Sequence, residues 1–290
     1  MKLTAKNYYS RAVNRSFMSV SQYKDFCKCE AMAMAIINGT YEKPKSRALF
    51  LGSLFDELLT GNKKSQIKFV VENRADFFQS SSKTNKLDDV SFLALLKEDF
   101  ESIFAAEHKP YADVVQAYET AKKVKQQPLM MKYLSGANQK IMTGEIAGVP
   151  FKIKMDSYKE DEFVADLKYM ASLRSPNLFE SIVKYWGYDI QGSVYQEVVR
   201  QNTDKRLPFY LTIATKENIP HLDIAEVMQY DLDEKLEEVM KKTPRYQAIK
   251  NGEIEPERCE EYDCPYCTAT RILTEPIDSN MLGMARKIDA

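Results

Sequence analysis

The stretch GEIAGVPFKIKMD (residues 144–156), followed after nine intervening residues by DLK (166–168), decides the fold of this chain. Apolar and polar residues alternate through both parts, as is typical of β-strands. The pair Ala147-Gly148 predicts a tight hairpin between the first two strands. A third alternating run at 162–170 follows a short charged turn. The sequence therefore predicts a β-meander in the middle of the chain.

The same stretch brings charged side chains together. Side chains alternate between the two faces of a strand, so Asp166 and Lys168 should share a face, and a hairpin can bring Asp156 beside them. Glu145, on the preceding strand, could supply another acid. Carboxylates are the ligands that Mg²⁺ and Mn²⁺ prefer, and a lysine can offset charge developing on a phosphate. On its own, however, the pattern could equally be a solvated strand face.

Helices are predicted on both sides of the meander. The expected helices cover residues 19–39, 46–59, 188–201 and 231–249, and further strands are expected at 207–215 and 221–229. The predicted class is α/β (α+β), with a central mixed sheet flanked by helices. We expect a single domain (1–290), comprising a mainly helical N-terminal part (1–135), a catalytic core (136–250) and a cysteine-containing tail (251–290).

Composition limits the function. With 41 basic and 42 acidic residues the net charge is -1, which argues against coating of nucleic acid through bulk charge. Only two histidines are present, so a catalytic metal would be held mainly by carboxylates. Neither a secretory signal nor an apolar run of bilayer length is evident, so we expect a cytoplasmic protein with no membrane partner.

Three further features give the acidic cluster a context. Gln191 and Tyr195 lie four residues apart, on one face of a predicted helix. Asp56 lies in the early helix segment GSLFDELL. Cysteines occur near both ends of the chain and bracket the predicted core.

Together, GEIAGVPFKIKMD, VADLK, WGYDIQGSVYQ and the terminal CPYC resemble RecE-type (exonuclease VIII-like) nucleases of phages and prophages. These belong to the PD-(D/E)xK superfamily, and RecB-family nuclease domains and lambda exonuclease are more distant relatives. The resemblance extends from SVSQYKDFCKCEA to the cysteine tail. It implies a restriction-endonuclease-like core with an N-terminal helical region.

The resemblance also implies roles for individual residues. Asp156 and Asp166 match the metal-binding acids, joined by the main-chain carbonyl of Leu167, and Lys168 matches the catalytic lysine. Glu145 matches the acid that precedes the core motif. Gln191 and Tyr195 match a pair of residues on a helix that lies beside the active site and the DNA end. Many RecB-family members carry a metal-binding histidine where this chain has Asp56, so Asp56 is a further candidate ligand; alternatively, it faces solvent.

The cysteines form a second candidate metal site. Cys259, Cys264 and Cys267 supply three soft ligands within nine residues, and Cys29 matches the fourth family cysteine better than Cys27 does. The resemblance implies a 4Fe–4S cluster that ties the chain ends together. Four thiolates also suit structural zinc, and the spacing does not separate the two. Three reduced thiols in a surface tail are the alternative.

The function implied by the resemblance is that of a Mg²⁺- or Mn²⁺-dependent exodeoxyribonuclease. It would digest double-stranded DNA ends 5′→3′ and leave 3′ single strands for a RecT-like single-strand annealing protein. A homo-oligomeric ring and a phage or prophage gene in a bacterial host are also implied. Alternatives are a single-strand-specific nuclease or endonuclease of the same fold, in repair or spacer acquisition, and a non-catalytic DNA-binding protein.

Overall fold

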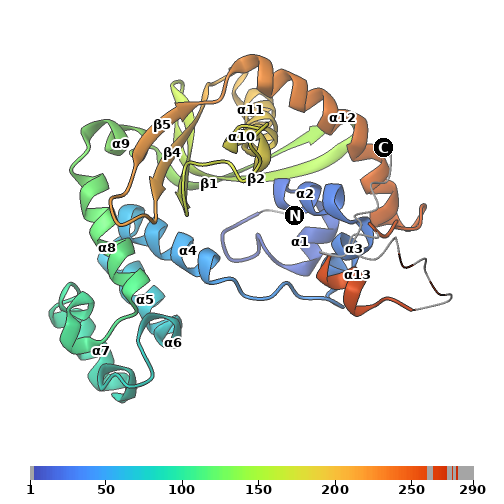
Figure 1. Cartoon of the computed structure of the whole chain (residues 1–290). Coiled ribbons are helices and arrows are strands. Elements are labelled where there is room, and N and C mark those ends of the chain that lie inside the picture. Colours follow the sequence, from blue (N-terminus) through green and yellow to red (C-terminus); the bar gives the residue numbers. More distant parts are fainter. Residues whose placement is uncertain (1–2, 260–263, 273–275, 277–278, 280–290) are drawn as a thin grey trace.

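A five-stranded mixed sheet forms the centre of the protein. The computed structural model describes residues 3–259, 264–272, 276 and 279. The strands lie in sequence order: β1 (Ala137–Ile146), β2 (Val149–Lys159), β3 (Phe163–Met170), β4 (Phe209–Thr215) and β5 (Leu222–Glu226). β3 and β4 are parallel, and all other neighbours are antiparallel. The prediction of a mixed α/β sheet flanked by helices is confirmed (Figure 1).

The meander begins with the expected hairpin. Ala147 and Gly148 both have positive φ, at 50° and 76°, which is the backbone of a two-residue primed turn. Glycine takes this conformation without strain, because it lacks a Cβ. The turn fixes the β1–β2 register, in which Ile146 faces Val149 and Ala137 faces Tyr158.

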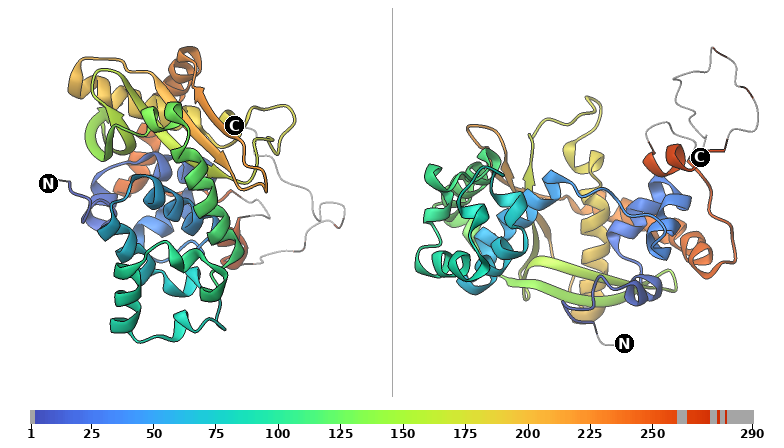
Figure 2. Two further views of the ribbon diagram at one scale, coloured as in Figure 1. Left: turned by 90° about the vertical axis from the view of Figure 1, so that its left-hand side faces the viewer. Right: turned by 90° about the horizontal axis from the view of Figure 1, so that it is seen from below.

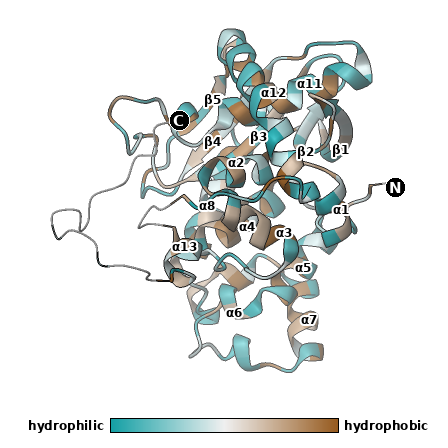
Figure 3. Cartoon of the chain, turned by 90° about the vertical axis from the view of Figure 1, so that its right-hand side faces the viewer, coloured by the Kyte–Doolittle hydropathy of each residue, from teal (hydrophilic) through white to brown (hydrophobic). Residues whose placement is uncertain are grey.

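One face of the sheet is covered by helices from both ends of the chain. These are α2 (Val20–Lys28), α11 (Tyr188–Thr203) and α12 (Gln229–Asn251). Buried apolar side chains from these helices and from the strands form one core, including Phe26, Phe151, Val198 and Phe209. The many charged residues of α12 give that helix a hydrophilic outer side (Figure 3).

The opposite face of the sheet is covered by helices that lie, in the sequence, between the N-terminal helices and β1. α4 (Arg47–Thr60) lies against β3, where Phe55 stacks on Tyr169 with ring centroids 4.1 Å apart. α8 (Ala112–Lys125) packs on α4, and α9 (Pro128–Tyr133) leads into β1. Outside them lie α5 (Lys63–Glu72), α6 (Arg74–Phe77), α7 (Asp89–Glu98) and three short 3₁₀ turns (Figure 2).

The helix predicted over residues 19–39 is two helices. α2 ends at Lys28, and α3 (Glu30–Asn38) begins after Cys29, whose φ of -165° and ψ of 111° are extended. The Cys29 thiol accepts a hydrogen bond from the Met32 amide, as an N-cap side chain does. The prediction of one continuous helix was wrong because residue 29 ends one helix and caps the next.

The remaining helices are short or close the chain. α1 (Arg11–Ser16) precedes α2, α10 (Ile182–Tyr185) precedes α11, and α13 (Pro265–Ala269) packs beside α3 (Figure 1). In the described part of the chain, no helix combines the length and apolar character needed to cross a bilayer.

Candidate active site

The candidate site lies where β2 and β3 separate. The two strands pair only from Ser157 with Ala165 to Lys159 with Phe163. Beyond Ser157, β2 continues beside β1 while β3 continues beside β4. Backbone groups on the inner sides of this fork have no partner strand. The fork is therefore open to side chains, and Asp156 and Asp166 are the residues at its base.

Asp156 caps the open edge of β3. Its Oδ2 accepts a hydrogen bond from the Leu167 amide at 3.1 Å, replacing the strand partner lost at the fork. The Leu167 amide thus connects β3 to Asp156. The Leu167 carbonyl as a metal ligand remains a prediction.

Gln139 connects Asp156 to a third carboxylate. It has a φ of 53°, and the ladder between β1 and β2 is interrupted where Gln139 faces Asp156, with no extra residue on either strand. Its amide donates to Asp156 Oδ1 at 3.2 Å and to Asp56 Oδ2 at 3.1 Å. Asp56 on α4 therefore faces the site and not solvent, held in addition by Thr60 at 3.1 Å. The structure therefore agrees with Asp56 as a candidate metal ligand and not with an Asp56 that faces solvent.

On the other side of the fork, Asp166 pairs with Lys168. Asp166 is only 3% exposed, and its carboxylate forms an ion pair with the Lys168 ammonium. Gln191 on α11 joins both: its Nε2 donates to Asp166 Oδ1, and its Oε1 accepts from Lys168 Nζ at 3.1 Å. The helix approaches this closely because residue 192 is glycine. A Cβ there would lie 2.5 Å from a ring carbon of Phe209.

Burial and mutual repulsion shape the electrostatics of the acids. Burial, followed by the negative charges of Asp166 and Asp56, raises the pKa of Asp156 well above its usual range. The pKa of Asp56 is raised as well, mainly by burial. Burial alone would lower the pKa of Lys168, because it disfavours the charged ammonium. The nearby Asp166 outweighs this effect through its charge and its hydrogen bond, so the pKa of Lys168 is raised. A cation in this site would relieve the repulsion among the carboxylates.

Tyr195 has a positioning role. Its hydroxyl donates to the Lys154 carbonyl on β2 at 2.9 Å, so it connects α11 to the strand that carries Asp156. Its burial raises its pKa well above the ordinary value for tyrosine. The hydroxyl is thus a neutral hydrogen-bond donor near the site.

A basic cavity adjoins the acids. It has a volume of about 210 Å³ and includes Ser19, Ser21, Lys24 and Lys154 beside Gln191 and Tyr195. Lys24 donates to the Trp186 carbonyl at 2.9 Å, and burial together with the nearby Lys168 lowers its pKa to about 8. This cavity could not be predicted from sequence patterns, because α2 and β2 are more than a hundred residues apart.

Glu145 does not belong to the cluster. It lies at the hairpin end of β1, opposite Pro150, whereas Asp156 lies opposite Gln139. Six residues of strand separate Glu145 from Gln139, which is about 20 Å. Its side chain is exposed, and its backbone is bound by Gln201. The assignment of Glu145 to the catalytic and metal site was wrong, because the antiparallel register carries it away from Asp156.

The chemistry of the carboxylates suits a divalent cation of the Mg²⁺ type, which prefers oxygen ligands. Asp56, Asp156 and Asp166 come from three different elements, and burial, with a smaller contribution from neighbouring negative charges, raises the pKa of Asp156 and of Asp56. Asp56, Asp156 and Asp166 are therefore the side chains that would hold the ion.

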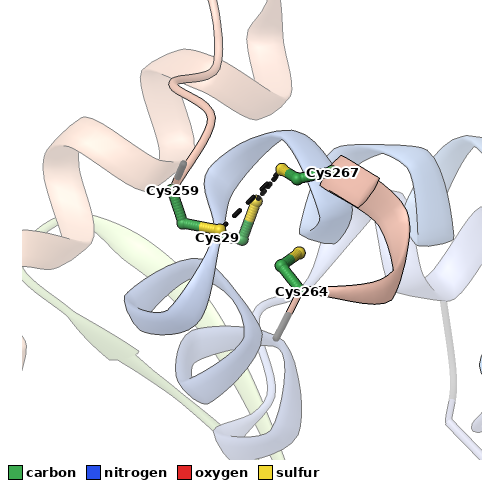
Figure 4. A group of neighbouring side chains, drawn as sticks. All are labelled: Cys29, Cys259, Cys264 and Cys267. Carbon is green, nitrogen blue, oxygen red and sulfur yellow. Dashed lines mark hydrogen bonds between the residues drawn. The ribbon is translucent and has the colours of Figure 1, made fainter. Parts of the chain in front are cut away.

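The four predicted cysteines also converge (Figure 4). Cys29, Cys259, Cys264 and Cys267 have sulfur atoms that all lie within 4.8 Å of one another. Cys27 lies outside this group and is exposed. The cluster connects the α2–α3 junction to the segment after α12. This group is separate from the acidic site.

The fold and the acidic site together define a PD-(D/E)xK-type protein: a mixed sheet whose forked strands carry Asp156 and the Asp166-x-Lys168 pair. Comparison with known sequences agrees. Residues 19–270 match the model of a family described as "PDDEXK-like domain of unknown function (DUF3799)", and the chain belongs to this family. The resemblance to PD-(D/E)xK nucleases of the RecE type is thus confirmed.

A solved structure supports the same assignment. It is a crystal structure from Eubacterium rectale described as "Putative exonuclease", with 38% sequence identity and a TM-score of 0.76. The match covers 98% of this chain and 100% of that chain. No curated protein matches the sequence. Family and structural neighbour together support a nuclease.

Proposed function

We propose that this protein is a Mg²⁺- or Mn²⁺-dependent DNA exonuclease that digests double-stranded ends 5′→3′. The observation that carries the proposal is the convergence of Asp56, Asp156 and Asp166 beside Lys168 at the strand fork. The name of the Eubacterium rectale neighbour supports an exonuclease. The polarity rests on the RecE-type resemblance.

The residues of the site divide the work of phosphodiester hydrolysis. A divalent ion bound by the three carboxylates would polarise the phosphate and favour ionisation of the attacking water. Lys168 is held by Asp166 and Gln191, so its ammonium is oriented before substrate arrives. From there it can stabilise negative charge that develops on the phosphate oxygens. Gln191 contacts both partners and is thus a positioning residue.

The basic cavity favours DNA ends as substrate. Lys24 and Lys154 supply positive charge, and Ser19 and Ser21 supply hydroxyl donors, directly beside the acidic cluster. A cavity of about 210 Å³ has the size of a small group and not of a groove that follows a continuous duplex. A terminal phosphate is small and carries extra negative charge, so it suits this position.

The wider role follows the same resemblance. An exonuclease of this polarity would leave 3′ single strands, which a RecT-like annealing protein could use in phage-type recombination. A homo-oligomeric ring around the DNA would make digestion processive. We infer a cytoplasmic site of action in a bacterial host cell, because the substrate is intracellular DNA.

The test is digestion of a linear duplex with a different label at each type of end, in Mg²⁺ or Mn²⁺. We expect loss of label from 5′ ends only and no cleavage of a closed circular duplex. Cleavage of the circle would indicate an endonuclease, and digestion restricted to single strands would indicate a single-strand-specific nuclease. No cleavage by folded, metal-supplied protein would leave a non-catalytic DNA-binding protein.

A further inference from the structure

The four-cysteine cluster joins the two ends of the described chain. Cys29 lies at the α2–α3 junction, and Cys259 follows the long helix α12. Cys264 and Cys267 flank the first turn of α13. Three of the four are nearly buried, with Cys29 3%, Cys264 8% and Cys267 6% exposed. Four thiols from three separate segments in one buried place are typical of a metal site.

The distances between the sulfur atoms distinguish a single zinc ion from a 4Fe–4S cluster. Cys29 Sγ lies 3.5 Å from Cys267 Sγ, and Cys259 Sγ lies 3.8 Å from Cys267 Sγ. No pair of the four exceeds 4.8 Å. A tetrahedron of thiolates about 2.3 Å from a zinc ion has edges of ~3.8 Å. In a 4Fe–4S cluster each thiolate binds a different iron, so the sulfurs enclose the whole cube and lie about 6 Å apart.

We propose that Cys29, Cys259, Cys264 and Cys267 bind a single zinc ion and not the 4Fe–4S cluster that the family resemblance implies. The observed sulfur separations fit one tetrahedral ion and are too short for a cubane. Among single ions, Zn²⁺ binds such sites more tightly than Fe²⁺ does. The sulfurs are also too far apart for disulfides, whose bonds are close to 2.05 Å.

The surroundings suit a tetrathiolate that carries net negative charge. The Met32 amide, in the first turn of α3, donates to Cys29 Sγ at 3.4 Å. The Arg258 guanidinium donates to the Cys267 carbonyl at 2.9 Å and so places a positive charge next to the cluster. Such groups orient ligands and offset their charge. Tyr41 and Tyr266 pack edge to face beside the cysteines and limit access of water.

A zinc ion here would be structural. It would hold α13 against α3 and so secure the segment after α12 to the N-terminal helices that cover the sheet. Zn²⁺ has no redox chemistry, so the site would not respond to oxygen or reductant as an iron–sulfur cluster does. Loss of the ion would lower stability without altering the carboxylates at the fork.

The test is the metal content of full-length protein, produced in cells supplied with both iron and zinc and purified without oxygen. We expect a single zinc ion per chain, no acid-labile sulfide and no visible absorption. Replacement by Co²⁺ should give the absorption spectrum of a tetrahedral cobalt thiolate. Cys264→Ser should lose the zinc, whereas Cys27→Ser, which alters the exposed cysteine outside the cluster, should retain it.

The opposite results would overturn the proposal. Iron with an equal amount of sulfide and a brown protein would establish the iron–sulfur cluster. A single bound iron, or fully reduced thiols with no metal in the wild type, would also contradict zinc. These measurements on the wild type stand even if Cys264→Ser fails to fold, and none depends on nuclease activity.

Discussion

At the scale of single residues, Lys168 experiences two opposing effects. Burial disfavours its charge, whereas Asp166 and Gln191 hold the ammonium in place. The net effect is a raised pKa, so the side chain stays charged at neutral pH. A permanently charged lysine next to three acids is suited to electrostatic stabilisation and not to proton abstraction.

Lys168→Met should therefore reduce the cleavage rate by about 10²–10³-fold, the usual cost of losing one preorganised stabilising group. The measurement is initial cleavage rate at saturating Mg²⁺. Lys205→Met is the matched control, because Lys205 pairs with Asp161 on a turn away from the fork. Equal rates for the Lys168 variant and the wild type would rule out this role.

The raised pKa of Asp156 predicts how the metal-free protein responds to pH. Below a pH of about 3.9, the pKa of an aspartate in an unfolded chain, Asp156 is protonated in both the folded and the unfolded state and does not reduce the stability of the fold. As pH rises from there to the higher pKa of the folded state, the unfolded chain releases its proton while burial and repulsion keep the folded state protonated, so stability falls. Above the pKa that Asp156 has in the folded state, the loss of stability has reached its full size.

Asp156→Asn should remove this pH-dependent loss and raise the melting temperature of the metal-free protein at neutral pH. The asparagine oxygen can still accept the Leu167 amide, so the fork stays capped. Melting curves from pH 4 upward, with chelator present, check this. A variant that melts below the wild type at neutral pH would show that the Asp156 carboxylate stabilises the fold.

At the scale of elements, the fork and the interrupted ladder at Gln139 determine which side chains meet. The shared face of Asp166 and Lys168 was readable from strand alternation, whereas the place of Gln191 beside them was implied only by the family resemblance. The interruption at Gln139 was not readable, because one left-handed residue leaves the alternating pattern of a strand unchanged. Glu145 was misplaced because it was assigned by its match to a family motif, although the predicted turn at Ala147-Gly148 sets it opposite Pro150.

The Gln139 bridge gives an element-scale prediction. Gln139→Ala would remove the amide that bridges Asp56 and Asp156, so the two acids would be less well oriented for a metal. We expect the Mg²⁺ concentration for half-maximal activity to rise about 10–100-fold, the usual effect of losing such a supporting group. Gln247→Ala is the control, since the Gln247 amide contacts Asn251 on α12 and none of the acids. An unchanged Mg²⁺ dependence would mean that the bridge is incidental.

At the scale of the whole molecule, elements from distant parts of the sequence complete the site. Asp56 comes from α4, which reaches the fork because Phe55 packs on Tyr169 on the opposite face of the sheet. α2 and α11 add Lys24 and Gln191 from the other face. The central meander and its flanking helices followed from local patterns, and the mixed sheet followed from the family resemblance. The placement of Asp56 and the basic cavity did not, because they depend on how helices more than a hundred residues apart pack on the sheet.

The central claim is that the active centre is the cluster at the fork and excludes Glu145. The most direct measurement compares Mg²⁺-dependent digestion of linear duplex DNA by the wild type, Asp166→Asn and Glu145→Gln, each shown to be folded by circular dichroism. We predict that Asp166→Asn is inactive and that Glu145→Gln keeps nearly wild-type activity. Retained activity in Asp166→Asn, or its loss in Glu145→Gln alone, would contradict this placement of the active site.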